Sequence, residues 1–341
     1  MAATLPATLD GMDAMSTMRA WQVAAKGEGA QLREVEVPAV GAGQARVRVE
    51  ASSLNFKDAL AVTGKGRIMR NFPCIAGIDL AGTVEESQDA NWPAGTPVLL
   101  TGCNIGEQFD GGLAEQAVVD AGSLVRRPEG VDALQAMRYG TAGFTAGLAV
   151  QRMRDNGQEP DQGPIAVTGA SGGVGSVAIA LLSKLGYSPV AVSSKSDQAD
   201  YLRALGASDI VNARDYPAAE APLLKARWGG VVDNVGGTLL ATLIAETRPW
   251  GNVASIGLAA SHKLETTVMP FILRGVNLLG IHSVETPMPR RQSVWDALFG
   301  DWQVDSTLWQ REVIGLEQVG EACATLMAGG ITGRYVVDCT R

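Results

Sequence analysis

Hydrophobic and polar positions follow two different patterns along the chain. Between residues 18 and 140, short β-branched segments alternate with turn residues, and residues 46–50 (RVRVE) show the period of two that is typical of a half-buried strand. Residues 78–84 and 96–100 are further candidate strands. This part of the chain is therefore predicted to form an all-β lobe.

From Thr141 the pattern changes to strands that alternate with helices. Residues 164–168 (PIAVT) form a continuous apolar strand, followed by a glycine-rich turn and a helix over 176–185 that ends at Gly186. The alternation continues through predicted strands at 190–193, 210–212, 231–235, 253–256 and 276–281 and predicted helices at 197–205 and 238–246. This order predicts a doubly wound parallel sheet covered by helices on both faces.

The last part of the chain resembles the first lobe more than the second. Helical segments near 294–298 and 316–327 precede a final strand at 335–337. The sequence therefore predicts a β-rich domain from residues 18–140 and 286–341, interrupted by an α/β domain at 141–285. Residues 1–17 lack a basic start and an apolar stretch, so they are predicted to be a flexible N-terminal extension rather than a signal peptide.

Composition narrows the classes of function. The 341 residues carry a formal net charge of −8 and few aromatic residues, which argues against a nucleic-acid-binding protein and against a partner at an anionic membrane. The four cysteines are widely spaced, and no apolar run approaches the ~18 residues of a membrane span. The sequence therefore predicts a reduced, cytoplasmic protein without a disulfide framework or a zinc ribbon.

The strongest chemical signal is the segment 168–175 (TGASGGVG), which lies between a predicted strand and a predicted helix. Residues without a Cβ let backbone N–H groups approach a pyrophosphate, and the helix N-terminus behind them favours the anion. Ala170 occupies the first position of the G-x-G-x-x-G fingerprint. An ordinary strand–helix turn is the alternative, but the surrounding pattern favours a dinucleotide site.

The end of the next strand indicates which dinucleotide binds. NAD enzymes usually place Asp or Glu there to bind the ribose 2′-hydroxyl, whereas this chain has Ser193, Ser194 and Lys195. Two hydroxyls and an ammonium suit a 2′-phosphate, and Arg214 could add a second cation. NADPH is therefore the predicted cofactor, although Lys195 could instead belong to a solvated loop.

The same octet also fits the turn of short-chain reductases. In those enzymes the turn lies near the N-terminus, and a Tyr-x-x-x-Lys pair serves the reaction. Here 167 residues precede the turn, and none of the five tyrosines is followed by Lys four positions later. The short-chain interpretation is therefore rejected.

The order of the lobes resembles the medium-chain dehydrogenase/reductase superfamily. This resemblance implies that the β-rich domain is a GroES-like catalytic domain and that the α/β domain is of the Rossmann type. Zinc enzymes of this superfamily take ligands from the Cys of C-x-x-D and the His of G-H-E, where this chain has Asn55 and Ile78. Because zinc prefers thiolate and imidazole ligands, the chain is expected to be a zinc-free member with no metal.

Further segments resemble the quinone-oxidoreductase-like proteins, and among them the acrylyl-coenzyme A reductase (NADPH) subfamily. They are SSLNFKDAL (52–60), TGKG (63–66), RNFP (70–73), GLAEQ (112–116), GTAGFTA (140–146) and TVMPFILR (267–274). The implied activity is NADPH-dependent reduction of the C=C bond of acrylyl-CoA to propionyl-CoA, with hydride added at the β-carbon. The alternatives are an NADPH:quinone or enone reductase and a non-catalytic NADPH- or RNA-binding protein.

The resemblance also implies a set of cofactor-binding residues. Phe56 stands where the subfamily usually has Tyr. Ser194-Lys195 replaces Gly-Arg, which keeps a cation but loses the guanidinium that could bind a phosphate through two hydrogen bonds. The implied cofactor residues are Phe56, Ser171, Gly172, Gly173, Val174, Ser193, Ser194, Lys195, Arg214, Leu258, Ile272 and Ser283.

Candidates for catalysis and substrate binding are fewer. Asn55 has two amide hydrogens and is the preferred donor to the enolate oxygen, with the alternative that it holds the cofactor or the loop around Lys57. Coenzyme A brings phosphates, for which Lys65, Arg67 and Arg70 are candidates unless they form only a solvated loop. The superfamily resemblance also implies a homodimer.

Overall fold

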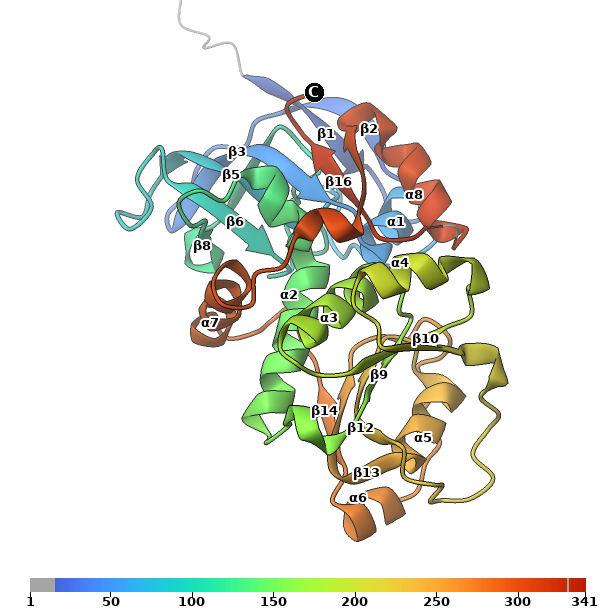
Figure 1. Cartoon of the computed structure of the whole chain (residues 1–341). Coiled ribbons are helices and arrows are strands. Elements are labelled where there is room, and N and C mark those ends of the chain that lie inside the picture. Colours follow the sequence, from blue (N-terminus) through green and yellow to red (C-terminus); the bar gives the residue numbers. More distant parts are fainter. Residues whose placement is uncertain (1–15, 330) are drawn as a thin grey trace, which may run out of the picture.

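The computed structural model describes residues 16–329 and 331–341. The chain forms two lobes, a β-rich first lobe and an α/β second lobe, which are the upper and lower halves of the molecule in Figure 1. Most of the predicted N-terminal extension lies outside the described residues. Thr17, which was assigned to that extension, already belongs to the first strand.

The first lobe contains a three-stranded sheet ordered β2-β1-β4 and a seven-stranded sheet ordered β15-β16-β3-β5-β6-β8, with β7 paired to β3. The predicted period of two at residues 46–50 is confirmed, because Val47 and Val49 of β3 are buried. The strands are β1 (Thr17–Val23), β2 (Gln31–Glu36), β3 (Gln44–Ser53), β4 (Cys74–Ile75), β5 (Asp79–Ser87), β6 (Pro97–Thr101), β7 (Gln116–Asp120), β8 (Val125–Arg126), β15 (Gln310–Gly315) and β16 (Arg334–Asp338).

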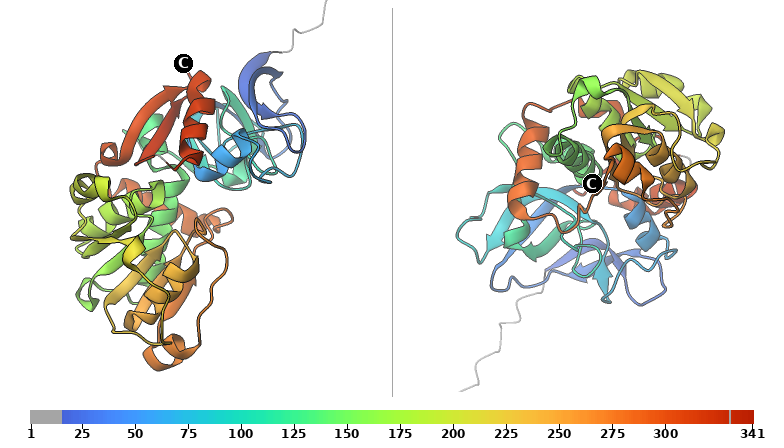
Figure 2. Two further views of the ribbon diagram at one scale, coloured as in Figure 1. Left: turned by 90° about the vertical axis from the view of Figure 1, so that its right-hand side faces the viewer. Right: turned by 90° about the horizontal axis from the view of Figure 1, so that it is seen from below.

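The prediction that residues 18–140 form an all-β lobe is wrong, because they also contain α1 (Phe56–Val62). The predicted helix near 316–327 is confirmed as α8 (Val319–Met327), which packs against α1, and the two are the red and blue helices of Figure 2. The helix α1 is too short to show a helical period in the sequence. It begins after Asn55, whose backbone N–H donates to Asp58 Oδ2 at 2.8 Å in a capping arrangement.

The second lobe contains the predicted doubly wound sheet. Its six strands are all parallel and are ordered β11-β10-β9-β12-β13-β14, which is the strand order of the Rossmann fold. The strands are β9 (Ile165–Thr168), β10 (Pro189–Ser193), β11 (Asp209–Asn212), β12 (Trp228–Asp233), β13 (Thr247–Ser255) and β14 (Asn277–Gly280). The helices are α3 (Gly173–Lys184), α4 (Ala199–Ala204), α5 (Gly237–Ala245) and α6 (Met269–Arg274).

A helix that the sequence analysis missed connects the lobes. The helix α2 (Ala133–Asp155) is kinked at Gly140, which has φ 49° and ψ −156°, and it crosses the predicted boundary between residues 140 and 141. It packs against β3 and β5 of the first lobe, against α3 of the second, and against α7 (Met288–Phe299). Its many Gly, Ala and Thr residues hide the helical pattern, and the domain limits at 140 and 286 stay a prediction. Among the described residues, no helix has the length and apolar character needed to cross a bilayer.

Candidate functional site

The glycine-rich turn connects β9 to α3, as the sequence predicted. Gly169 has a left-handed φ of 57°, and its carbonyl accepts the N–H of Gly172 at 2.9 Å. A Cβ on Gly175 would lie 2.8 Å from Ala170 Cα and closer still to the Gly169 carbonyl oxygen. The turn therefore fits an anion bound by backbone N–H groups, with Ser171, Gly172, Gly173 and Val174 at or beside the start of the helix.

The four residues expected at the 2′-phosphate lie at the ends of two neighbouring strands. Ser193 ends β10 and pairs with Asn212 of β11, after which Arg214 is exposed. The Ser193 hydroxyl accepts the N–H of Lys195 at 3.1 Å, and Ser194 is exposed beside them. The Lys195 ammonium donates to the Ile331 carbonyl at 2.8 Å, which leaves further N–H donors free. These residues fit a phosphorylated nicotinamide cofactor.

Of the residues expected near the nicotinamide, the structure brings Leu258 and Ser283 to the same edge of the sheet. They follow the carboxyl ends of β13 and β14, where ligands of doubly wound sheets bind. Phe56 belongs to the other lobe and is more than half exposed at the start of α1.

Ile272 is not brought to this edge. It lies on α6, where the Arg274 guanidinium donates to the carbonyl of Thr247, the first residue of β13, at 3.1 Å. The first residue of a parallel strand lies at the end of the sheet opposite to the nucleotide turn, and Figure 1 shows α6 at the end of the molecule away from the first lobe. Within one chain, Ile272 therefore lies apart from the other cofactor candidates.

A buried polar network, here called the Asp79 junction, lies where the two lobes meet. It consists of Ser53, Asn55, Asp79, Thr141 and Arg334, which come from four separate segments of the chain. The Asp79 carboxylate accepts hydrogen bonds from the Asn55 amide at 2.8 Å and from the Thr141 N–H at 2.9 Å. The Arg334 guanidinium donates to Ser53 Oγ at 2.7 Å and lies 3.8 Å from Asp79.

The Asp79 junction touches the nucleotide turn directly. A Cβ on Gly173 would lie 3.0 Å from Arg334 Nη1, and Gly333 N–H donates to the Ser171 carbonyl at 3.1 Å. Arg334 also donates to Asn55 Oδ1 at 3.2 Å, which joins the start of α1 to the same turn. Arg334 Nε is buried and has no hydrogen-bond partner among the described residues. Phe56 is thereby held beside the turn.

Electrostatics at the junction are dominated by burial. Burial, and then the nearby Asp79 carboxylate, raise the pKa of Asp58 to about 7. Burial lowers the pKa of the Arg334 guanidinium, while Asp79 and Asp58 raise it. Since a guanidinium is not deprotonated in proteins, Arg334 stays charged and offsets the charge of Asp79.

The geometry of Asn55 does not favour the expected role as an enolate donor. Its amide nitrogen donates to Asp79 Oδ2 at 2.8 Å and to Asp58 Oδ2 at 3.0 Å, so both hydrogens are used inside the protein. Its oxygen accepts from Arg334. Asn55 therefore positions the start of α1, which is the alternative that the sequence left open.

The loop that follows β6 forms another contact between the lobes. Cys103 N–H donates to the Val284 carbonyl at 3.0 Å, and the Asn104 amide donates to Glu285 at 3.2 Å. In the same loop, Glu107 accepts the Lys57 ammonium at 2.7 Å. Lys57 is therefore paired with Glu107.

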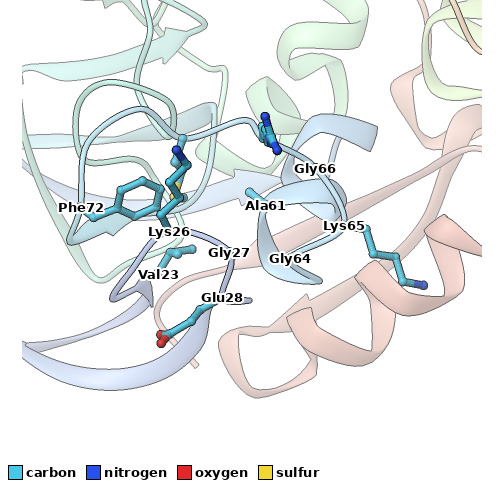
Figure 3. A pocket seen from close by; sticks show the side chains of 11 residues that line it. Val23, Lys26, Gly27, Glu28, Ala61, Gly64, Lys65, Gly66 and Phe72 are labelled. Carbon is cyan, nitrogen blue, oxygen red and sulfur yellow. The ribbon is translucent and has the colours of Figure 1, made fainter.

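The three candidate phosphate cations separate in the structure. Lys65 and Arg67 line a cavity of about 530 Å³ in the first lobe, together with Lys26, Met69 and Phe72. Figure 3 shows Lys26 and Phe72 on one side of this cavity, whereas the Lys65 side chain extends away on the other side. Arg70 does not line the cavity and lies close enough to Glu285 to lower the pKa of that carboxyl, after the larger effects of Asn104 and His282.

Sequence reasoning missed Arg334, Glu107 and Lys26. Arg334 starts the last strand and carried no motif, and a buried arginine at a strand start is visible only as a charge in an apolar segment. Lys26 lies in the turn between β1 and β2. No group of three or more His, Cys, Asp or Glu side chains that could hold a metal occurs within residues 16–329 and 331–341.

Known families match both lobes. Residues 41–129 match the family described as Alcohol dehydrogenase GroES-like domain, and residues 173–299 match the family described as Zinc-binding dehydrogenase. The chain is 50% identical over 295 residues to "Probable acrylyl-CoA reductase AcuI" of Escherichia coli, and the match covers 86% of this chain and 91% of that protein.

Solved structures show the same fold. The yhdH oxidoreductase from Salmonella enterica in complex with NADP superposes with a TM-score of 0.88 at 42% identity, covering 95% of this chain and 99% of that one. Bacillus subtilis protein yhfP with NAD bound superposes with a TM-score of 0.91 at 38% identity, covering 95% and 100%. The chain therefore belongs to the medium-chain dehydrogenase/reductase superfamily, in the quinone-oxidoreductase-like group that includes the acrylyl-CoA reductases.

Proposed function

We propose that this protein is an NADPH-dependent acrylyl-CoA reductase that converts acrylyl-CoA to propionyl-CoA. The observation that carries the proposal is the carboxyl edge of the six-stranded sheet, where a glycine turn is followed by Ser193, Lys195 and Arg214 instead of an acidic residue. Half of the aligned residues are shared with a relative named as a probable acrylyl-CoA reductase.

When bound, NADPH supplies the hydride for the β-carbon. The protein holds the cofactor phosphates through the turn and the cations beside β10 and β11. The Asp79 junction fixes the start of α1, and so Phe56, against the turn. The α-carbon takes its proton from solvent. The rate of reduction thus depends on how the chain positions the alkene against the cofactor.

We propose that the reduction proceeds without a metal. Asn55 and Ile78 stand at the positions of two zinc ligands in the resembling enzymes, and the Asn55 amide is already bonded to two carboxylates. Zinc analysis of purified protein tests this proposal. Stoichiometric zinc whose removal abolishes activity would contradict it.

We also propose a homodimer that acts in the cytoplasm. The strand β14 is an edge strand, and exposed apolar side chains surround it, among them Trp250, Ile272, Leu273 and Leu278. A large exposed apolar patch usually marks an interface. The structure joins none of Cys74, Cys103, Cys323 and Cys339 in a disulfide, which agrees with a cytoplasmic location. A monomer in sedimentation experiments at micromolar concentration would contradict the dimer.

The central experiment follows NADPH oxidation with acrylyl-CoA, crotonyl-CoA, a free enone and a quinone side by side. We expect the highest kcat/KM with acrylyl-CoA, and propionyl-CoA as the product. Faster turnover of the quinone or the enone, with no thioester reduction, would replace the proposal by the alternative of a quinone or enone reductase. Binding of NADPH without turnover of any acceptor would indicate a non-catalytic protein.

A further inference from the structure

We propose that the cavity between Lys26, Arg67 and Phe72 binds the 3′-phosphoadenosine end of coenzyme A. This inference rests on the proposed function and gives the substrate a second anchoring point outside the nucleotide turn. The cavity lies in the first lobe, between the turn that follows β1 and the loop that follows α1. Its volume of about 530 Å³ lies within the range of about 300–1,000 Å³ that is usual for small-molecule sites.

The cations that line the cavity are free to bind an anion. Neither Lys26 nor Arg67 forms an ion pair or a side-chain hydrogen bond with any residue that the structure describes. Other cations of the first lobe are paired, as Lys57 is with Glu107. Glu28 is the acidic residue of the lining, and Figure 3 shows its carboxylate pointing away from Lys26 and Phe72. The positive charge on that side of the cavity is therefore not neutralised by the lining.

The rest of the lining suits a flat heterocycle. Phe72 offers an aromatic face beside Lys26, while Val23, Ala61 and Met69 add apolar surface. An aromatic face next to cations is the combination that binds a purine ring and its phosphate. The two loops also meet by their backbones, because a Cβ on Gly29 would lie 2.8 Å from the Val62 carbonyl oxygen. The two walls of the cavity are thus held at a fixed separation.

The position of the cavity matches the shape of the substrate. Phe56 begins α1 beside the nucleotide turn, whereas Ala61, near the other end of the same helix, lines the cavity. The seven residues of α1 span about 10 Å at the usual helical rise. An acyl group reduced beside Phe56 would therefore extend its pantetheine arm along α1 and place its nucleotide in the cavity.

Such a site would offset the net charge of the chain. A protein with a formal charge of −8 repels the polyanionic substrate at a distance. A local pair of unpaired cations offsets this repulsion where the phosphate is held. Recognition of the 3′-phosphate would also distinguish coenzyme A thioesters from smaller acyl acceptors.

The test compares binding of coenzyme A with binding of dephospho-coenzyme A, by calorimetry on the full chain saturated with NADP⁺ so that the nucleotide turn is filled. Wild-type protein should bind coenzyme A at least about tenfold more tightly, since a charged hydrogen bond is worth one to two powers of ten. The variant Lys26→Ala/Arg67→Ala should lose this preference. The variant Lys184→Ala/Arg203→Ala removes the same charges from exposed positions of the second lobe and should keep it.

Turnover gives a second measurement. With acrylyl-CoA, Lys26→Ala/Arg67→Ala should raise KM about tenfold and leave kcat unchanged, while both constants for the pantetheine thioester stay the same. Equal binding of coenzyme A and dephospho-coenzyme A by wild-type protein, or an unchanged preference in the variant, would overturn the cavity assignment. If the protein prefers coenzyme A over dephospho-coenzyme A but reduces no thioester, only the proposed function would be overturned.

Discussion

The nucleotide turn and the Asp79 junction touch each other through Arg334, but the turn consists mainly of backbone groups and the junction of polar side chains. The turn uses backbone N–H groups, small residues and the start of α3, and its shape depends on the absence of side chains at positions such as Gly175. The junction uses charged and polar side chains, of which Ser53, Asp79 and Arg334 are almost completely buried, with Asp79 and Arg334 as its ionic pair.

This difference indicates that the two regions should respond differently to substitution. A side chain added to the turn occupies the space of the ligand or shifts α3, so its main effect should fall on cofactor binding. A side chain removed from the junction leaves a buried charge without its partner, so its main effect should fall on stability.

The largest effect is expected at the junction. Replacing Arg334 by Met removes the cation that faces the buried Asp79, and we expect the free energy of unfolding to fall by about 3–5 kcal/mol. Urea denaturation monitored by circular dichroism measures this change. The double variant Asp79→Asn/Arg334→Met should recover part of the loss, because the charge left behind is then absent. A single variant as stable as wild type would show that the junction does not hold the lobes together.

The next effect concerns the turn. In Gly175→Ala the new Cβ would overlap the Gly169 carbonyl, so we expect α3 to shift and NADPH affinity to fall about 100-fold, with a much smaller loss of stability than in Arg334→Met. Fluorescence titration with NADPH and a thermal melt separate the two quantities. Gly122→Ala is the control, since a Cβ there meets only the Asp120 side chain at 3.3 Å. Unchanged NADPH affinity in Gly175→Ala would disprove the close approach.

The same contrast explains what the sequence could reveal. The turn is one contiguous segment, and its octet, its strand and its helix were all predictable from local pattern. The parallel sheet was predictable for the same reason, because its central strands are each a short, continuous apolar segment that is buried. Resemblance added the cofactor residues, of which Leu258 and Ser283 lie at the expected edge.

The junction could not be predicted because its members are far apart in the chain. Ser53, Asp79, Thr141 and Arg334 meet only after β3, β5, α2 and β16 have assembled. For the same reason the sequence suggested that Asn55 was a free donor, although its amide is already bonded to Asp58 and Asp79. It also grouped Arg70 with Lys65 and Arg67, which the cavity separates. Adjacency in sequence is a poor guide where loops reverse direction.

A smaller effect should distinguish the two nicotinamide cofactors. Lys195→Ala removes an ammonium near the end of β10, and we expect NADPH affinity to fall about tenfold while NADH affinity stays the same. The relative that was solved with NAD makes this comparison informative. Ratios of kcat/KM for NADPH and NADH measure the change. An equal loss for both cofactors would show that Lys195 acts through its bond to Ile331 and not through the 2′-phosphate.

The smallest effect, counted per pH unit, is a pH dependence of stability beside the junction. The pKa of Asp58 is raised to about 7 by burial and by Asp79, and it lies near 4 in an unfolded chain. The folded protein therefore holds a proton that the unfolded chain releases. The contribution of Asp58 is fully present below pH 4 and is lost as pH rises toward 7, with a slope of about 1 kcal/mol per pH unit. The groups that face Asp58 are Asp79, Cys323 and Arg334 and the N–H donors of Asn55 and Ile78.

The measurement is urea denaturation between pH 4.5 and 8 for wild type and for Asp58→Asn. The amide cannot titrate, so the variant should show a flatter dependence than wild type even if its stability is lower at every pH, because the Ile78 and Asn55 N–H groups need acceptors. Other carboxyls whose pKa is raised by desolvation, at Asp110 and Asp233, remain in both proteins and cancel in the difference. Parallel curves would show that Asp58 is ionised throughout this range, so that Arg334 would have to offset two carboxylates instead of one.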